Sequence, residues 1–296
     1  MKNVLILGES GFLGRHIKEY IVKNHSRYEI DSPSSKELDL INEEEVTKYL
    51  KNKYYDIILH CAVHNPVNNK NRDKNKSLDY SLKMFFNFEK NQHLFGKMIY
   101  FGSGAEFDKR RDLRKVNEEK FGDSIPVDEY GFAKYIINKS IINSDNIYNL
   151  RLFGIYGKYE NWTCKFISNI CCKAIKGIPL TIRQNVFFDY LYIDDFLKIL
   201  DYFLENTPKY KDYNICTGKG VDLKTYAEIV RKISNKNLPI YIGKEGLAKE
   251  YTGNNSRLIS EIGDFNYVSE EEAIKKLYTW YEENQEKIEL LPLLYQ

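Results

Sequence analysis

The stretch VLILGESGFLG, residues 4–14, places a run of apolar residues directly before a glycine-rich turn. Its glycines are spaced Gly8-x-x-Gly11-x-x-Gly14, and residues 12–24 continue with the apolar spacing of a helix. A glycine turn between a strand and a helix lets the backbone approach a pyrophosphate, while the helix N-terminus supplies N–H donors and a positive dipole. The stretch therefore predicts a dinucleotide-binding unit; a plain strand–helix turn is the alternative.

Apolar strands and amphipathic helices alternate through the first half of the chain, which is typical of a parallel sheet covered on both faces. After about residue 158, short strands mix with helices. We therefore predict an α/β fold, a Rossmann-type doubly wound parallel sheet with a smaller, interleaved C-terminal substrate lobe. Residues 1–157 are assigned to the dinucleotide-binding domain and 158–296 mainly to the lobe, with segments near 183–217 returning to the first domain. The expected strands are 3–8, 28–30, 56–63, 97–103 and 149–157, and the expected helices are 12–24, 43–53, 78–93 and 130–143.

Composition excludes several classes of protein. The net charge of +2 does not suggest a nucleic-acid partner. The histidines and cysteines show neither CxxC pairs nor metal-ligand spacing, so we expect reduced thiols and no metal site. No run of 18 apolar residues is present and a strand follows Met1, so we expect a cytoplasmic protein without a membrane span. The cysteines are Cys61, Cys164, Cys171, Cys172 and Cys216.

A second motif combines a strand that ends in serine with a tyrosine–lysine pair. MIYFGSG ends a strand at Ser103, and PVDEYGFAK, residues 126–134, follows after a loop. Tyr-x-x-x-Lys occurs three times in this tyrosine- and lysine-rich chain, but only the second occurrence follows a serine-ending strand and starts a helix. The three pairs are Tyr49/Lys53, Tyr130/Lys134 and Tyr135/Lys139.

These motifs together resemble the extended short-chain dehydrogenase/reductase family of NAD-dependent epimerases and dehydratases, which act mostly on nucleotide sugars. The resemblance implies a catalytic triad of Ser103, Tyr130 and Lys134. Tyr130 would exchange the proton, and Lys134, one helical turn on, would lower the tyrosine pKa and hold the nicotinamide ribose. Ser103 would hydrogen-bond the reacting oxygen.

Further matches extend the resemblance over nearly the whole chain. HCAV, residues 60–63, takes the place of the family's (N/H)-x-A-A. LRLFGIYG, residues 150–157, resembles L-R-x-x-N-V-Y-G, with Gly154 in place of the asparagine. FFDYLYIDD, residues 187–195, resembles R-D-F-x-x-V-x-D, but Phe188 replaces the arginine that often holds the substrate pyrophosphate.

The resemblance also implies two sets of ligand-binding residues and no metal ligand. The cofactor set is Gly8, Ser10, Gly11, Phe12, Leu13, Gly14, Asp31, Ser34, Lys36, Asp39, Leu40, Cys61, Ala62, Val63, Tyr130 and Lys134. The substrate set is Ser103, Gly104, Ala105, Lys165, Arg183, Asp189, Tyr190 and Arg257.

The segment after the second strand bears on the choice of nucleotide. Asp31 stands where an acidic residue usually binds the adenosine ribose diol and favours NAD. Ser32, Ser34, Ser35 and Lys36 could instead surround a 2′-phosphate. We favour NADP(H), with NAD(H) as the alternative.

The residues after Ser103 indicate the reaction. The 4,6-dehydratases of the family carry Thr-Asp-Glu here, whereas this chain has Gly104 and Ala105, and Glu106 comes one position too late and should point to the other side. GDP-fucose synthase has a cysteine at the position of Ala105 and a histidine on the helix after the Y-G motif. Residues 161–173 contain no histidine, so no base for C3 or C5 is expected; Cys164 or Lys165 falls near that position.

The chain thus looks most similar to nucleotide-sugar 4-ketoreductases of the GDP-fucose synthase and CDP-abequose synthase type. This predicts an NADPH-dependent C4-ketoreductase of a nucleotide-diphospho-6-deoxy-4-keto hexose or heptose, GDP-, CDP- or dTDP-linked, in surface-polysaccharide (capsule or O-antigen) precursor synthesis. A 4-epimerase with tightly bound NAD and a non-catalytic NADP-binding regulator are the alternatives.

The resemblance further implies a homodimer through a four-helix bundle across a two-fold axis. The two helices would be those near 78–93 and 130–143. Their apolar residues exceed what one buried face needs; the alternative is that all of them face the home sheet. These residues are Leu82, Phe85, Phe86, Ile136, Ile137 and Ile141.

Overall fold

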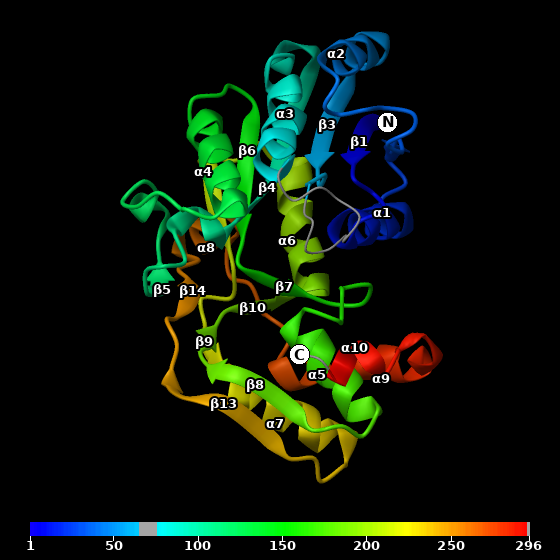
Figure 1. The fold of residues 1–296 in the computed structure, drawn as a ribbon. Helices are drawn as coiled ribbons and strands as arrows, with labels where there is room; N and C mark the ends of the chain where they lie inside the picture. Colours follow the sequence, from blue (N-terminus) through cyan, green and yellow to red (C-terminus); the bar gives the residue numbers. More distant parts are fainter. Residues whose placement is uncertain (65–75, 295–296) are drawn as a thin grey trace.

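The computed structural model describes residues 1–64 and 76–294, and its largest element is a six-stranded sheet. The strands are β1 (Lys2–Leu7), β2 (Tyr28–Asp31), β3 (Tyr55–His60), β4 (Phe95–Ser103), β6 (Ile147–Leu152) and β11 (Asp212–Ile215). They lie in the order β11-β6-β4-β3-β1-β2, and every neighbouring pair is parallel (Figure 1). This arrangement confirms the predicted Rossmann-type fold.

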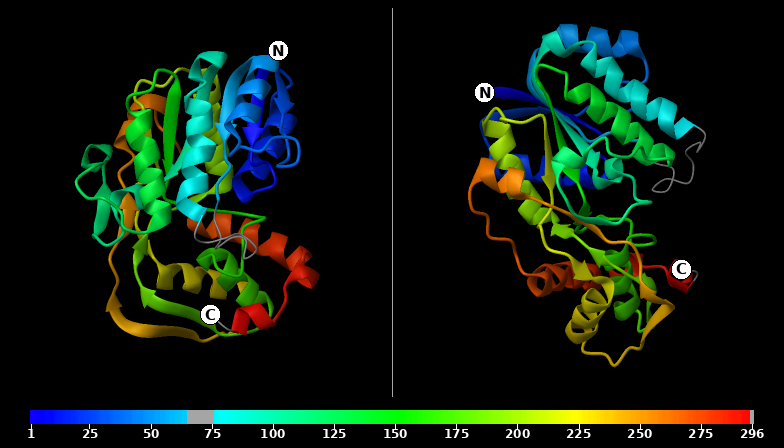
Figure 2. Two further views of the ribbon diagram at one scale, coloured as in Figure 1. Left: turned by 45° about the horizontal axis from the view of Figure 1, so that its top comes forward. Right: turned by 90° about the vertical axis from the view of Figure 1, so that its left-hand side faces the viewer.

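Helices cover both faces of the sheet, as Figures 1 and 2 show. Neighbouring strand residues point to opposite faces, so Val4 and Ile6 join one core and Leu5 and Leu7 the other. This explains why the strands are apolar throughout. One face carries α1 (Phe12–Asn24) and α6 (Ile193–Glu205); the other carries α2 (Glu43–Asn52), α3 (Ser77–Glu89) and α4 (Glu129–Ile141).

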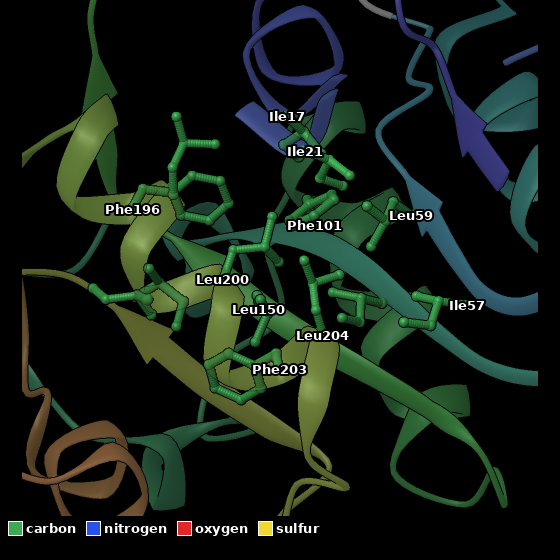
Figure 3. Close-up of a cluster of buried hydrophobic side chains, with 14 of the residues drawn as sticks. Ile17, Ile21, Ile57, Leu59, Phe101, Leu150, Phe196, Leu200, Phe203 and Leu204 are labelled. Carbon is green, nitrogen blue, oxygen red and sulfur yellow. The ribbon is translucent and has the colours of Figure 1, made fainter. Parts of the chain in front are cut away.

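The core beneath α1 and α6 is shown in Figure 3. Ile17 and Ile21 of α1 meet Phe196, Leu200 and Phe203 of α6 over the sheet, and all of these side chains are fully buried. Since α6 and β11 come from the second half of the chain, residues 193–215 complete a sheet that the first half begins. The assignment of segments near 183–217 to the first domain stays a prediction.

A smaller lobe packs around a second core, below the sheet in Figure 1. It is built from α5 (Phe166–Ile175), α7 (Leu223–Ser234), α9 (Glu270–Glu283), α10 (Leu291–Leu294) and the parallel pair β8 (Leu180–Asn185) and β13 (Ile240–Leu247). Two short sheets join it to the large one: β7 (Gly154–Tyr156) with β10 (Tyr190–Tyr192), and β12 (Val221–Asp222), β9 (Phe187–Phe188), β14 (Tyr251–Gly253) and β5 (Leu113–Val116). The helix α8 (Ser256–Ile262) packs beside β11.

Some predicted elements have different bounds in the structure. The strand expected over 56–63 ends at His60, and the Cys61 N–H makes one further bond to the Leu7 carbonyl oxygen at the end of β1. The strand expected over 149–157 is divided into β6 and β7 at Phe153, whose side chain enters a separate core cluster. The domain boundary at residue 157 stays a prediction. Within the described residues, no helix combines the length and apolar character that a membrane span requires.

Candidate active site

The glycine-rich turn lies where the direction of strand addition reverses. β1 lies between β2 and β3, so the chain leaves β1 toward one edge of the sheet and later returns on its other side. In open α/β sheets, ligands bind beyond the carboxyl ends of the strands at such a point. Gly8 follows β1 and Cys61 follows β3, which brings these two predicted cofactor residues to one place.

Backbone atoms lie so close to Gly8 and Gly14 that a side chain would not fit at either position. A Cβ on Gly14 would lie 2.4 Å from the Gly8 carbonyl oxygen, and one on Gly8, whose φ is +79°, would lie 2.8 Å from Ala62 Cα. Gly11 is the N-cap of α1, and no side chain caps the free N–H groups there. Uncapped N–H groups at a helix N-terminus fit a phosphate, so this cradle suits the pyrophosphate of a dinucleotide. The other turn residues of the predicted set, Ser10, Phe12 and Leu13, flank it.

The segment after β2 holds the predicted adenosine-binding residues. The Asp31 carboxylate accepts hydrogen bonds from the hydroxyls of Tyr49, at 2.8 Å, and Tyr55, at 2.5 Å. Lys18 of α1, which sequence reasoning missed, donates to Ser32 Oγ over 2.9 Å and pairs with Glu9 of the glycine turn. A cation therefore lies at the end of β2.

The remaining predicted residues of that segment lie at or near the surface. Ser34 donates through its backbone N–H to Glu37, and Lys36 is exposed. Asp39 is exposed and accepts from the Ile41 N–H. The Leu40 carbonyl and the segment Cys61–Val63 are partly covered, and burial raises the pKa of the Cys61 thiol.

Ser103 ends β4 and caps the short 3₁₀ turn η3 (Gly104–Phe107). Its hydroxyl accepts from the Ala105 N–H at 3.2 Å, and its own backbone N–H donates to Glu106 at 3.0 Å. The two bonds form a capping box, which fixes the serine at the carboxyl end of the sheet.

Tyr130 reaches the serine from the first turn of α4, where Asp128 caps the helix by accepting from the Gly131 N–H at 2.9 Å. Burial raises the pKa of the Tyr130 phenol, and a hydrogen bond with the Ser103 hydroxyl acts to lower it. The structure thus brings these two predicted catalytic groups into contact.

Lys134 follows one helical turn later, with its ammonium 5.9 Å from the centre of the Tyr130 ring. Burial lowers the lysine pKa to about 8, while the Glu106 carboxylate acts to raise it. The ammonium donates to the Tyr100 hydroxyl and to the Phe101 carbonyl oxygen, each over 2.7 Å. A buried cation beside a phenol favours the tyrosinate, as proton exchange at Tyr130 requires.

A second phenol, Tyr251 of β14, joins this group and was missed in the sequence. A Cβ on Gly104 would lie 2.5 Å from its hydroxyl oxygen, and a hydrogen bond with Ser103 acts to lower its pKa, which burial raises. Tyr251 stacks on Phe188 at 4.7 Å, and Phe188 stacks on Tyr190 at 4.5 Å. Aromatic rings therefore occupy the place where the resemblance would have put an arginine.

Four predicted substrate residues have contrasting surroundings. Gly104 and Ala105 are buried, so their side-chain positions are covered by protein. Lys165 is exposed at the N-cap of α5, and Arg183 is exposed on β8. Among the predicted substrate residues, only Lys165 and Arg183 have a cationic side chain that is exposed on the lobe.

Two other predicted substrate residues are used within the protein instead. Asp189 is fully buried, and its carboxylate accepts from the N–H groups of Thr217, at 2.8 Å, and Gly218, at 2.9 Å. Arg257 donates to Asp212 over 2.6 Å and to Glu119 over 2.7 Å. Because carboxylates already hold its guanidinium, Arg257 is not free to bind a phosphate.

A buried ion network supports the serine turn. Arg151 of β6 is fully buried and donates to Glu106 over 2.8 Å, to Asn214 over 2.9 Å and to Asp212 over 2.5 Å. The Glu106 carboxylate is engaged within the protein, because Arg151, Asn149 and the Ser103 N–H hold it.

Comparisons with known proteins agree with this architecture. Residues 4–216 match the model of the NAD dependent epimerase/dehydratase family. A GDP-L-colitose synthase from Yersinia pseudotuberculosis is 21% identical over 303 residues, which cover 94% of this chain and 97% of that protein. A GDP-L-fucose synthetase from Naegleria fowleri superimposes with a TM-score of 0.82 at 18% identity, covering 97% of this chain and 95% of the other. The GDP-mannoheptose C4 reductase of Campylobacter jejuni with NADP bound gives 0.81 at 18% identity, with 95% and 98% covered.

Replacing Tyr130 by phenylalanine should lower turnover by about 10²- to 10⁴-fold, because the ring still packs but has no proton to give. The affinity for the nucleotide should stay within about twofold by fluorescence titration, since the binding cradle is untouched. Tyr135→Phe is the matched control: this tyrosine packs at 5.0 Å on Phe121, away from Ser103. Loss of turnover in Tyr135→Phe with a normal rate in Tyr130→Phe would show that the triad is assigned wrongly.

Proposed function

Because the chain belongs to the NAD dependent epimerase/dehydratase family, we propose that it is an NADPH-dependent C4-ketoreductase of a nucleotide-diphospho-6-deoxy-4-keto sugar. One observation carries this proposal. The group of Ser103, Tyr130 and Lys134 is complete, while the neighbouring turn offers no acid or base, because Ala105 is buried and Glu106 is held by Arg151. Reduction needs one proton donor; elimination or epimerisation at C3 or C5 needs a further base.

The chemistry assigns one task to each side chain. Bound NADPH would supply the hydride that adds to C4. Tyr130 gives its phenolic proton to the C4 oxygen, so that the carbonyl becomes a hydroxyl, and Ser103 donates a hydrogen bond that orients this oxygen. The Lys134 cation stabilises the tyrosinate that remains.

The proposed substrate class is supported by proteins that align with this chain over nearly its whole length. The similar proteins include a GDP-L-colitose synthase and a GDP-mannoheptose C4 reductase; both names describe GDP-linked sugars, and the second names a reduction at C4. We propose a hexose or heptose linked to GDP, CDP or dTDP, in the synthesis of surface-polysaccharide precursors, in the cytoplasm. Mixing the purified protein with a panel of such 4-ketosugars and following NADPH absorbance tests the proposal directly.

The same experiment separates the two alternatives. A nucleotide-sugar 4-epimerase would copurify with NAD and convert its substrate without added reductant. A regulator that binds NADP without chemistry would show nucleotide binding and no turnover with any sugar. Consumption of NADPH in step with ketosugar is the outcome that supports the reductase.

In heavy water, with a 4-ketosugar and without reduced cofactor, we expect no deuterium at C3 or C5 beyond that of the enzyme-free control. The reason is that no base faces the site from the turn at Ala105. Mass spectrometry or proton NMR of the recovered sugar measures the exchange. Rapid enzyme-dependent incorporation would contradict a simple C4 reduction, and its loss in Cys164→Ser or Lys165→Met would identify the base.

For the cofactor we propose NADP(H) over NAD(H). The Asp31 carboxylate is taken up by two phenol donors, and Lys18 places a cation beside Ser32 just past β2. A cation and a hydroxyl at this position suit a 2′-phosphate. The NADP-bound structure of a similarly folded C4 reductase agrees with this choice.

Lys18→Ala should weaken NADPH binding about tenfold, since a charge-assisted bond to phosphate is lost. NADH binding should change less than about twofold. Lys23→Ala, at the other end of the same helix, is the matched control. Equal losses for both nucleotides, or wild-type protein that binds NADH more tightly, would overturn the NADP assignment.

We also propose a homodimer through α3 and α4, but with fewer residues than predicted. Phe85, Ile137 and Ile141 are fully buried in the home core and cannot form an interface. This correction follows from strand and helix packing that a single sequence does not reveal. The partly covered Leu82, Phe86 and Ile136 remain for a partner.

Light scattering at micromolar concentration should give the mass of two chains. Ile136→Glu should shift it to one chain, because a charge would be buried in the apolar interface. Val22→Glu, at an exposed position on α1 (68% exposed), should leave the dimer intact. A wild-type protein with the mass of one chain would exclude the bundle.

A further inference from the structure

The ammonium of Lys134 uses two of its three N–H donors in hydrogen bonds to residues of β4. It donates to the Tyr100 hydroxyl and to the Phe101 carbonyl oxygen, each over 2.7 Å. Only 5% of Lys134 and 2% of Tyr100 is exposed. A buried cation with two fixed acceptors has its remaining N–H aimed in one direction.

Tyr100 is itself held rigidly. Its ring packs edge-on against Phe85 of α3 at 5.2 Å and lies 5.5 Å from the His60 ring at the end of β3. Alternation along β4 places Tyr100 on the face that α4 covers, so its hydroxyl meets Lys134 from below the helix. Packing therefore fixes the acceptor before any ligand binds.

His60 adds to this fixed position through packing and not through a hydrogen bond. Its Nε2 donates to the Met84 carbonyl oxygen at 3.1 Å. In the described part of the chain its buried Nδ1 has no hydrogen-bond partner, so the Tyr100 hydroxyl does not donate to it.

We propose that Tyr100 is a positioning residue for Lys134. Its hydroxyl would aim the ammonium at the nicotinamide ribose and keep it charged. This inference rests on the proposed function, which gives Lys134 that ribose contact. It assigns a role to one side chain outside the predicted catalytic set.

The charge on Lys134 depends on what faces it from each packed element. Burial lowers its pKa to about 8, and Glu106 on η3 and Cys61 after β3 act to raise it. Cys61 stays a thiol because burial raises its pKa, so Glu106 is the charged neighbour. Tyr130 and His60 are neutral near pH 7, since burial raises the pKa of the phenol and lowers that of the imidazole. The Tyr100 acceptor supplements this single anion.

The test measures the affinity for NADP⁺ from pH 6 to pH 9. In wild-type protein the affinity should fall as pH rises through about 8, where Lys134 loses its proton. In Tyr100→Phe the fall should begin about one pH unit lower. The phenol oxygen that accepts from the Lys134 ammonium is lost, so the charged form is less stable and the lysine pKa falls. At pH 6 both proteins should bind within about twofold of each other.

Tyr28→Phe is the matched control, since Tyr28 is also buried in the large sheet and its hydroxyl has no partner among the described residues. It should follow the wild-type curve.

A Tyr100→Phe curve that coincides with wild type would overturn the inference. Lys134→Met separates this failure from failure of the proposed function. If Lys134→Met binds NADP⁺ as tightly as wild type at every pH, Lys134 does not hold the ribose and the proposed function loses its lysine. If Lys134→Met loses the pH dependence while Tyr100→Phe keeps the wild-type curve, only the role of Tyr100 is wrong.

Discussion

A cation that water does not reach holds together the edge of the sheet that carries the serine turn. Arg151 is fully buried. It donates hydrogen bonds to Glu106 in the turn after β4 and to Asp212 and Asn214 of β11. Removing one partner of a buried ion pair typically costs about 3–5 kcal/mol, because the other charge is left without solvent or counter-ion. The position of Ser103 is therefore set by electrostatics in the sheet interior as well as by β4 itself.

The same ions act on the candidate site at a distance. Glu106 balances Arg151, closes the capping box on Ser103 and acts to raise the pKa of Lys134. Asp212 is shared between Arg151 and Arg257, which extends the row of alternating charges to the outer edge of the sheet. Arg257, which looks like a free phosphate ligand in the sequence, is thus one end of the ion network that supports the serine turn.

Local patterns in the sequence were sufficient for the strands of the sheet and for the conformation of the glycine turn, because each depends on residues that are neighbours along the chain. The catalytic roles of Ser103, Tyr130 and Lys134 stay a prediction. Arg257 and Asp189 were assigned to the substrate because the sequence does not show that Asp212 and Thr217 would hold them. Tyr251 is brought to the serine turn by the pairing of β14 with β5 and β9, long-range contacts without a local signal. Tyr100 did carry one: a hydroxyl within an otherwise apolar buried strand requires a partner.

The interleaved path of the chain has a mechanical consequence. The backbone passes between the large sheet and the lobe at β7, again from β10 into α6, again after β11, and finally on both sides of α8 (Figure 1). A hinge made of one linker can swing freely, but links that run side by side must all bend together. The two parts should therefore unfold as a single cooperative unit, and neither is a module that can be exchanged between proteins without the other.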